Sequence, residues 1–263
     1  YKNGYREVTL LGQNVDSYRW NVNKKGEIIN NENPTTDFAE LLEMVAHVDP
    51  NLRVRFSTSH PKDMTDKVLH TMQKYKNICN YIHLPVQSGS STVLKKMNRG
   101  YTREWYLGRI DAIKRIIPGC AISTDIITGF CGETDHEHKE TLSLMNKVKF
   151  DFAYMFFYSE RPKTLAQRKF DDDIPLETKK ARLQEVIDIQ REHSLESNRR
   201  QIGKQVEVLV EGPSKKSNDF YCGRNSENTM IVFPKENIKK GDYVFVRIKD
   251  CTAATLKGEI VLS

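Results

Sequence analysis

Residues 121–134 read AISTDIITGFCGET, and this stretch decides the fold that we expect. It opens with an apolar run over 121–127, which predicts a strand, and it ends in a polar, glycine-containing loop over 129–134. A helix-like run follows at 135–148, and another strand-like run follows at 152–158. Strand, loop, helix and strand in this order are typical of a parallel sheet that is covered by helices.

The same alternation extends toward the amino terminus. Strand-like runs occupy 6–11, 52–57 and 78–84, and helix-like runs occupy 36–48, 66–76, 92–97 and 103–117, with a polar insertion at 21–33. The strands are apolar on both sides, as strands between two covering layers are. Right-handed connections would curve such a sheet toward a barrel, so we expect an α/β fold with a partial (β/α) barrel over residues 1–200.

The composition changes after residue 158. A charged linker covers 160–173, and a long helix with an apolar stripe is predicted over 175–200. Apolar residues then alternate with polar ones, which predicts five short strands at 206–210, 220–224, 229–233, 243–248 and 258–262, the first of them ending at Gly212-Pro213. Short strands at this spacing predict a small OB-like all-β barrel over residues 201–263.

Composition limits the class of protein. Of the 263 residues, 38% are hydrophobic and 29% are charged, which is typical of a soluble globular chain and not of a disordered one. The net charge of +6 and the pI near 8.9 favour an anionic partner such as RNA, although an ordinary basic cytosolic protein has the same balance. No apolar run approaches the roughly 20 residues that a membrane span needs, so we expect no membrane partner. The start at Tyr1 has neither an initiator Met nor a signal-peptide pattern, and we expect a segment cut from a longer cytoplasmic protein.

The cysteines predict no metal site in this chain. None of them has the CxxC or CxxxCxxC spacing of a local ligand set. Each is expected to be a small buried hydrophobic residue in a reducing cytoplasm. The five are Cys79, Cys120, Cys131, Cys222 and Cys251.

Four polar or glycine-rich loops each follow a predicted strand. They lie at 12–14, 57–61, 85–90 and 129–134. Ligands bind at the carboxyl ends of strands in parallel α/β folds. Four such loops at one edge of a sheet therefore predict a built binding site.

These loops also carry a resemblance to a known family. The motifs LLGQNV (10–15), STSHP (57–61), HLPVQSGS (83–90), MNRGYTR (97–103) and STDIITGF (123–130) are similar to the core motifs of radical SAM methylthiotransferases of the MiaB type. EGPSKK (211–216) and VFP (232–234) resemble the TRAM domain, an RNA-binding barrel. The motifs follow the family's order over nearly the whole chain. The resemblance implies a partial barrel of the radical SAM type followed by a TRAM barrel.

Three departures from the family pattern concern loops. Cys131 stands where the family usually has Pro, and Lys163 stands where it usually has Gly. The family's CxxxCxxC loop and an amino-terminal domain with three further cysteines have no counterpart in this chain. We therefore expect this chain alone to be inactive.

The resemblance implies an activity. The family adds a methylthio group to C2 of N6-isopentenyladenosine beside the anticodon of tRNA. It uses S-adenosylmethionine, two 4Fe-4S clusters and an electron donor. Its relatives that act on threonylcarbamoyladenosine or on an Asp of a ribosomal protein remain alternatives, as does a non-catalytic RNA-binding module. No catalytic residue is assigned in this chain.

Candidate cofactor-binding residues lie in the four loops and in the strand at 121–127, and the resemblance places 12–14 where the family meets the methionine amine. A Gln carbonyl accepts a hydrogen bond from an ammonium group and Gly permits close approach, but a plain glycine turn with an Asn cap has the same sequence. The residues are Gly12, Gln13, Asn14, Ser59, Gln87, Ser88, Thr124, Asp125 and Gly129. Asp125 lies in an apolar strand, where a buried carboxylate needs a partner, and a ligand or an arginine would serve equally. For Gln87 and Ser88 the alternative is the cap of the next helix, and for Gly129 it is a turn.

The second barrel carries the predicted RNA contacts. Basic side chains follow phosphates and aromatic faces stack on unpaired bases, although such residues are also common in surface turns and cores. The residues are Lys215, Lys216, Phe220 and Arg224. Arg99 and Arg103 are candidates for a substrate phosphate or carboxylate, or else belong to a solvated helix face.

Overall fold

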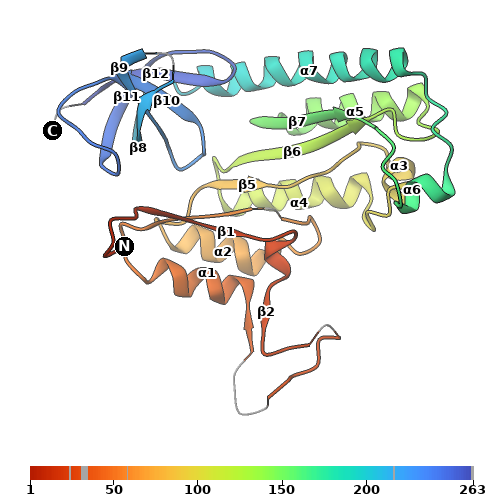
Figure 1. Ribbon diagram of the computed structural model, residues 1–263, viewed down its shortest axis with the longest axis horizontal. Coiled ribbons are helices and arrows are strands. Elements are labelled where there is room, and N and C mark those ends of the chain that lie inside the picture. The colour runs from red at the N-terminus through yellow and green to blue at the C-terminus, as the bar shows by residue number, and fades with distance from the viewer. Residues whose placement is uncertain (24, 31–34, 58, 216, 262–263) are drawn as a thin grey trace.

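A computed structural model describes residues 1–23, 25–30, 35–57, 59–215 and 217–261. Thr58 and Lys216, which belong to motifs named above, lie outside this part of the chain, as do the ends of the polar insertion and of the last predicted strand. The molecule has an α/β part and a small barrel, which lies beside one end of the α/β part (Figure 1).

Five parallel strands build the main sheet. They are β1 (Glu7–Leu11), β4 (Arg53–Ser57), β5 (Tyr81–His83), β6 (Ala121–Thr128) and β7 (Phe152–Phe157). The pairs β1–β4, β5–β6 and β6–β7 are parallel, and a parallel bridge between Val54 and Ile78 joins the two sets. The predicted α/β class and partial barrel are confirmed.

The covering helices begin where the sequence places capping residues. Asp37 and Thr134 each close a capping box, so α1 begins at residue 38 and α5 at residue 135. The helices are α1 (Phe38–Ala46), α2 (Asp66–Lys74), α3 (Ser91–Lys96), α4 (Arg103–Ile116), α5 (Asp135–Val148), α6 (Leu165–Lys169) and α7 (Leu176–Arg199), with a 3-10 turn η1 at Val15–Ser17. None of the helices in the described ranges is both long and apolar enough to cross a membrane.

Two segments contain structure that the sequence did not predict. The charged linker holds the short helix α6, whose first turn is capped by the Thr164 side chain. A small antiparallel pair, β2 (Arg19–Trp20) and β3 (Thr36–Asp37), flanks the polar insertion. Both are too short to produce a hydrophobic period.

The expectation that the strands are apolar on both sides is wrong. Val54 and Phe56 of β4 are buried in the main core together with the helices, whereas Arg53 and Arg55 point to the other face. On β7, Ala153 is 2% exposed, but Phe152 and Tyr154 on either side of it are 46% and 49% exposed. The helices therefore cover one face of the sheet, and the other, concave face carries polar and aromatic residues.

The small barrel is closed, as expected for an OB-like fold. Its strands are β8 (Gln205–Ser214), β9 (Ser217–Arg224), β10 (Met230–Pro234), β11 (Tyr243–Cys251) and β12 (Thr255–Ile260). They close in the order β10-β12-β11-β8-β9. The first strand was expected to end at Gly212-Pro213 but continues to Ser214. The register between β8 and β9 shifts between Val210 and Gly212, where the strand forms a β-bulge. Gly212 has a φ of +131°.

Two arginines of β4 fix the small barrel to the sheet. Arg53 donates to the carbonyl of Arg224 at 2.6 Å, and Arg55 donates to the carbonyls of Asn225 at 2.6 Å and Ser226 at 3.2 Å. Arg55 also pairs with Glu7 at 2.8 Å. Ser226 in turn accepts from the backbone N–H of Asn80 at 2.8 Å. The loop between β9 and β10 thereby covers the end of the sheet where the strands begin.

We predict that Arg55→Met destabilises the protein by about 3 kcal/mol or more. The Arg55 side chain is 7% exposed, and its loss leaves Glu7 and two backbone carbonyls without their donor. Urea unfolding of the purified chain measures the effect. Arg247→Met, at an exposed position on β11, is the matched control and should change stability by less than about 0.5 kcal/mol. Equal stability of the two variants would mean that these contacts do not join the domains.

Candidate functional site

A cavity of about 690 Å³ opens at the carboxyl edge of the sheet, the edge away from the small barrel. Its lining includes Gln87, Asp125 and Ile127, together with Phe156 of β7. Arg99 and Arg161 also line it. Its volume is in the range of small-molecule sites, and its wall combines apolar surface with a few polar groups. The predicted residues Gln87 and Asp125 thus lie together.

Gln87 is held in an unusual backbone conformation. Its φ is +74°, in the left-handed region that residues other than Gly seldom adopt. Its N–H donates to the carbonyl of Asp125 at 2.9 Å, and its carbonyl accepts from the N–H of Ile127 at 2.8 Å. These bonds hold the strained residue against β6, and such strain is frequent at binding sites.

Asp125 has a partner that the sequence did not indicate. His83 Nε2 lies 3.4 Å from the Asp125 carboxylate. The partner inside the chain is therefore a histidine and not the arginine that we considered as one alternative. His83 Nδ1 lies 2.8 Å from the Ser123 hydroxyl, which also bonds Tyr81 at 2.7 Å. This chain of polar groups crosses the concave face of β5 and β6.

Arg99 supplies an unused donor at the cavity. Its Nε atom is buried and has no hydrogen-bond partner among the described residues. A buried polar atom without a partner is costly and is often satisfied by a ligand. Arg99 follows α3 and does not lie on a solvated helix face. Arg103, by contrast, donates to the carbonyls of Gly89 and Glu140 and holds α4 against α5.

Ser88 and Thr124 do not face the cavity. The Ser88 hydroxyl contacts that of Thr141 on α5 at 3.3 Å, and it accepts from the N–H of Ser90. Thr124 donates to the carbonyl of Leu84 at 3.1 Å and accepts from the N–H of Val86. Both are fully buried on the helix side of the sheet, where they join neighbouring segments.

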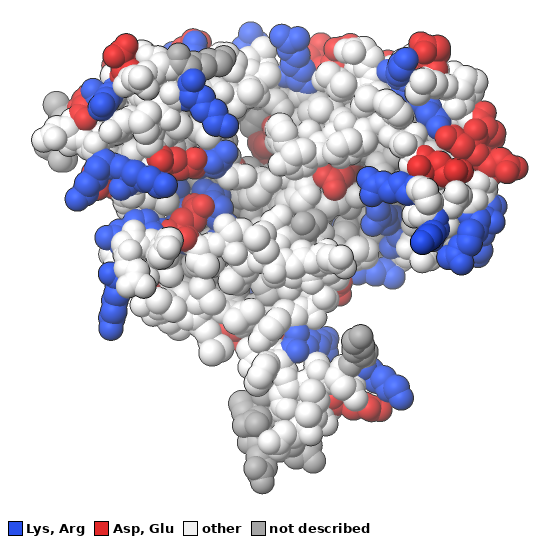
Figure 2. All heavy atoms as spheres, viewed as in Figure 1, with Lys and Arg blue, Asp and Glu red and all other residues white. Residues whose placement is uncertain are grey.

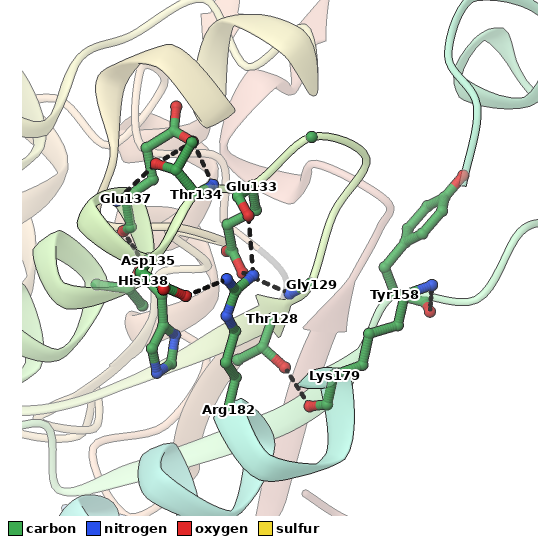
Figure 3. Close-up of polar contacts among 12 residues, drawn as sticks. Thr128, Gly129, Glu133, Thr134, Asp135, Glu137, His138, Tyr158, Lys179 and Arg182 are labelled. Carbon is green, nitrogen blue, oxygen red and sulfur yellow. Dashed lines mark hydrogen bonds and ion pairs between the residues drawn. The ribbon is translucent and has the colours of Figure 1, made fainter. Parts of the chain in front are cut away.

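Gly129 is held by a buried ion pair (Figure 3). Its N–H donates to Glu133 at 2.7 Å, and the same carboxylate accepts from Arg182 of α7 at 2.9 Å. Glu133 and Arg182 are 1% and 8% exposed, and burial raises the pKa of the Glu133 carboxyl. A Cβ at Gly129 would lie 2.5 Å from Cγ of Lys179. The close approach of Lys179 therefore explains why a glycine is needed at position 129, without any ligand.

The two departures from the family motifs fit the loops in which they occur. Cys131 is buried with Phe130 in a small cluster beside α3 and α6. Lys163 has φ +68°, the conformation that a glycine adopts without strain. The loop thus keeps the backbone geometry that the family's Gly favours.

The loop after β1 lies apart from the cavity described above. Gly12 bonds the carbonyl of Ser57, and Gln13 is exposed. Asn14 donates to Asp63 and accepts from the N–H of His60 at 3.2 Å. Ser59 is buried just after β4, and its hydroxyl lies against the Asp16 carboxylate.

Asp16, which the sequence did not single out, lies beneath this loop. Burial raises the pKa of its carboxyl to about 7, although the N–H of His60 donates to it at 3.1 Å. It is 7% exposed, and its second oxygen has no partner among the described residues. The sequence carries no signal for it beyond its place behind Asn14.

We predict that Asp16→Asn stabilises the protein at pH 8 by up to about 4 kcal/mol and much less at pH 5. A carboxyl with a raised pKa in the folded state destabilises the fold when it is ionised, above that pKa. This destabilisation disappears as the pH falls from about 7 to near 4, which is the ordinary pKa of an aspartate carboxyl. Unfolding free energies of both proteins at the two pH values measure the difference. An effect that does not depend on pH would contradict the assignment.

The small barrel presents some of the predicted RNA-binding residues. Lys215 is exposed, and Phe220 is 40% exposed. Arg224 has its guanidinium on both carboxylate oxygens of Glu211, at 2.7 and 2.8 Å. Lys235 lies over the ring of Tyr221 at 5.6 Å. Lys216 is outside the described residues.

The described residues do not fit an iron–sulfur cluster. They contain no group of three His, Cys, Asp or Glu side chains that could hold a metal ion. Cys79, Cys120 and Cys131 are buried, and burial raises the pKa of each thiol above its ordinary value. Such thiols are poor sources of thiolate ligands.

Comparisons with known proteins agree with this arrangement. The model of the radical SAM superfamily matches residues 1–145, and that of the TRAM domain matches residues 199–261. The tRNA-2-methylthio-N(6)-dimethylallyladenosine synthase of Amoebophilus asiaticus is 60% identical over 99% of this chain and 54% of its own length. The protein of the same name from Christiangramia forsetii is 57% identical over 97% of this chain and 54% of its own length.

The chain spans about half the length of these curated relatives. Among solved structures, coproporphyrinogen III oxidase from Escherichia coli matches with a TM-score of 0.49 and 17% identity, over 72% of this chain and 50% of the enzyme. The superfamily model covers more than half of the sequence. The chain therefore belongs to the radical SAM superfamily.

Proposed function

We propose that this chain is part of a radical SAM enzyme that transfers a methylthio group to N6-dimethylallyladenosine, also called N6-isopentenyladenosine, beside the anticodon of tRNA. The cavity with Gln87, Asp125 and the unpartnered Nε of Arg99 carries the proposal, because it offers a small polar molecule a built site. The names of relatives at 60% and 57% identity support this substrate.

We propose that the cavity binds S-adenosylmethionine. Asp125 and the Gln87 side chain would take the ribose hydroxyls, and Arg99 would take the carboxylate, for which a guanidinium is the natural partner. Gly129 shapes the neighbouring turn, while Gly12 and Gln13 are exposed at the end of β1, outside the lining of this cavity. Bound S-adenosylmethionine supplies the radical and the methyl group in this chemistry.

Iron–sulfur ligands have to come from residues other than those described. We propose two 4Fe-4S clusters and an external electron donor for the whole enzyme, as the family resemblance implies. The described side chains contribute the cofactor cavity, the concave face of the sheet and the small barrel. We place the activity in the cytoplasm, where tRNA is modified.

The small barrel is proposed to bind the anticodon stem-loop. We place the boundary between the two domains near residue 200, between α7 and β8. Lys215 and Phe220 are exposed and offer a phosphate contact and a stacking face. Arg224 contributes less than its sequence suggests, because Glu211 already neutralises its guanidinium.

We expect Asp125→Asn in the full-length protein to weaken S-adenosylmethionine binding by about tenfold or more. A hydrogen bond to a charged group is worth about 1.5–3 kcal/mol. Calorimetric titration of the anaerobically reconstituted protein gives the affinity, and binding of the stem-loop should be unchanged. Asp111→Asn, on the exposed side of α4, is the control. Normal cofactor affinity in Asp125→Asn would remove the cavity from the proposal.

The salt dependence of RNA binding separates two basic residues of the barrel. Lys215→Ala should reduce the slope of log affinity against log salt concentration by about one, as the loss of one phosphate contact does. Arg224→Ala should change the slope less, because its charge is paired with Glu211. Filter binding of an anticodon stem-loop to the full-length protein measures both. The reverse order would place the phosphate contact at Arg224.

A further inference from the structure

Three aromatic side chains form a strip on the concave face of β7. Phe152, Tyr154 and Phe156 are 46%, 49% and 55% exposed, whereas Ala153 between the first two is buried. Alternation along the strand puts all three on the side of the sheet that has no helices. We call these three residues the aromatic strip.

The strip is ordered by contacts with its neighbours. The rings of Phe152 and Tyr154 meet edge to face at 4.9 Å, and those of His83 and Tyr154 do so at 5.7 Å. Asp125 is the register partner of Tyr154 on β6. The strip therefore lies directly beside the His83–Asp125 pair, with part of each ring left uncovered.

One end of the strip enters the proposed cofactor cavity. Phe156 lines that cavity together with Asp125 and Ile127. The other end, at Phe152, begins β7 and lies toward the small barrel (Figure 1). A ligand that is held by the small barrel and reaches the cavity along β7 would pass the strip.

The charged side chains at the two ends of the aromatic strip indicate which kind of ligand it could bind. Arg99 and Arg161 line the cavity at the far end of the strip, and basic side chains lie on the small barrel at the near end. Figure 2 shows a mostly uncharged surface in the middle of this face, with a few acidic side chains in it, and both basic and acidic side chains at its two ends. Cationic groups on both sides of an uncharged aromatic surface complement a nucleic-acid strand, whose phosphates flank a flat base.

We infer that the aromatic strip holds the unpaired adenine of the RNA substrate, with the base stacked on Tyr154. This rests on the proposed function and adds the residues that position the substrate. Enzymes that act on a base take it out of its stack and hold it against aromatic side chains. Among the described residues, no hydrogen bond of the Tyr154 hydroxyl is found. We therefore assign the contact with the base to the Tyr154 ring.

Fluorescence of 2-aminopurine tests the inference without catalysis. An anticodon stem-loop with 2-aminopurine at the target adenosine is titrated with the full-length protein. Stacking on Tyr154 should change the emission on binding. Tyr154→Leu should abolish that change and lower kcat for tRNA modification by at least about fivefold, whereas Tyr154→Phe should retain both the change and the rate. Cofactor cleavage without RNA should be unaffected.

Two controls make the result decisive. Trp105→Leu removes an aromatic ring that is 42% exposed on the helix side of the molecule and should leave the emission change intact. Anisotropy of the same stem-loop should show that Tyr154→Leu binds overall within about twofold of the unaltered protein, because the small barrel supplies most contacts. An unchanged emission signal in Tyr154→Leu, with RNA still bound, overturns the inference. Failure of the unaltered protein to bind the stem-loop would instead overturn the proposed function.

Discussion

The contact of Arg53 and Arg55 with the backbone of the small barrel determines how the rest of the molecule can work. Both guanidinium groups are almost fully buried, and each donates to carbonyls in the segment 224–226. Carbonyl acceptors do not depend on side-chain identity, so the contact specifies the position of the loop rather than its sequence. It holds the small barrel at the end of the sheet where the strands begin. The carboxyl edge and the concave face remain accessible as a result.

With the small barrel in this position, the two faces of the sheet have different roles. Helices bury the apolar side chains of one face, and that face supplies the stability of the fold. The concave face carries charged residues near the small barrel, the Tyr81–Ser123–His83–Asp125 chain in the middle and the cavity at the carboxyl edge. A substrate bound to the barrel and a cofactor bound in the cavity would meet on this face. The aromatic strip lies along the boundary between them.

The sequence predicted the elements well and the direction of individual side chains poorly. Strong caps such as Thr134 and the change from helical to alternating apolar pattern locate the helices and the second barrel. Thr124 and Asp125 are adjacent on one strand, so only one of them can face the cavity, and an apolar strand does not reveal which. Ser88 was misplaced for a similar reason, since the left-handed backbone at Gln87 rotates the residues that follow. His83 and Arg182 act through partners distant in sequence, which no local pattern contains.

The most direct test of this account is a photochemical crosslink from the target base. An anticodon stem-loop with 8-azidoadenosine at the modified position is irradiated with the full-length protein, and the modified peptide is identified by mass spectrometry. The account predicts attachment within residues 150–163, the tryptic peptide that contains the aromatic strip. Attachment confined to the small barrel or to the outer helices would contradict it.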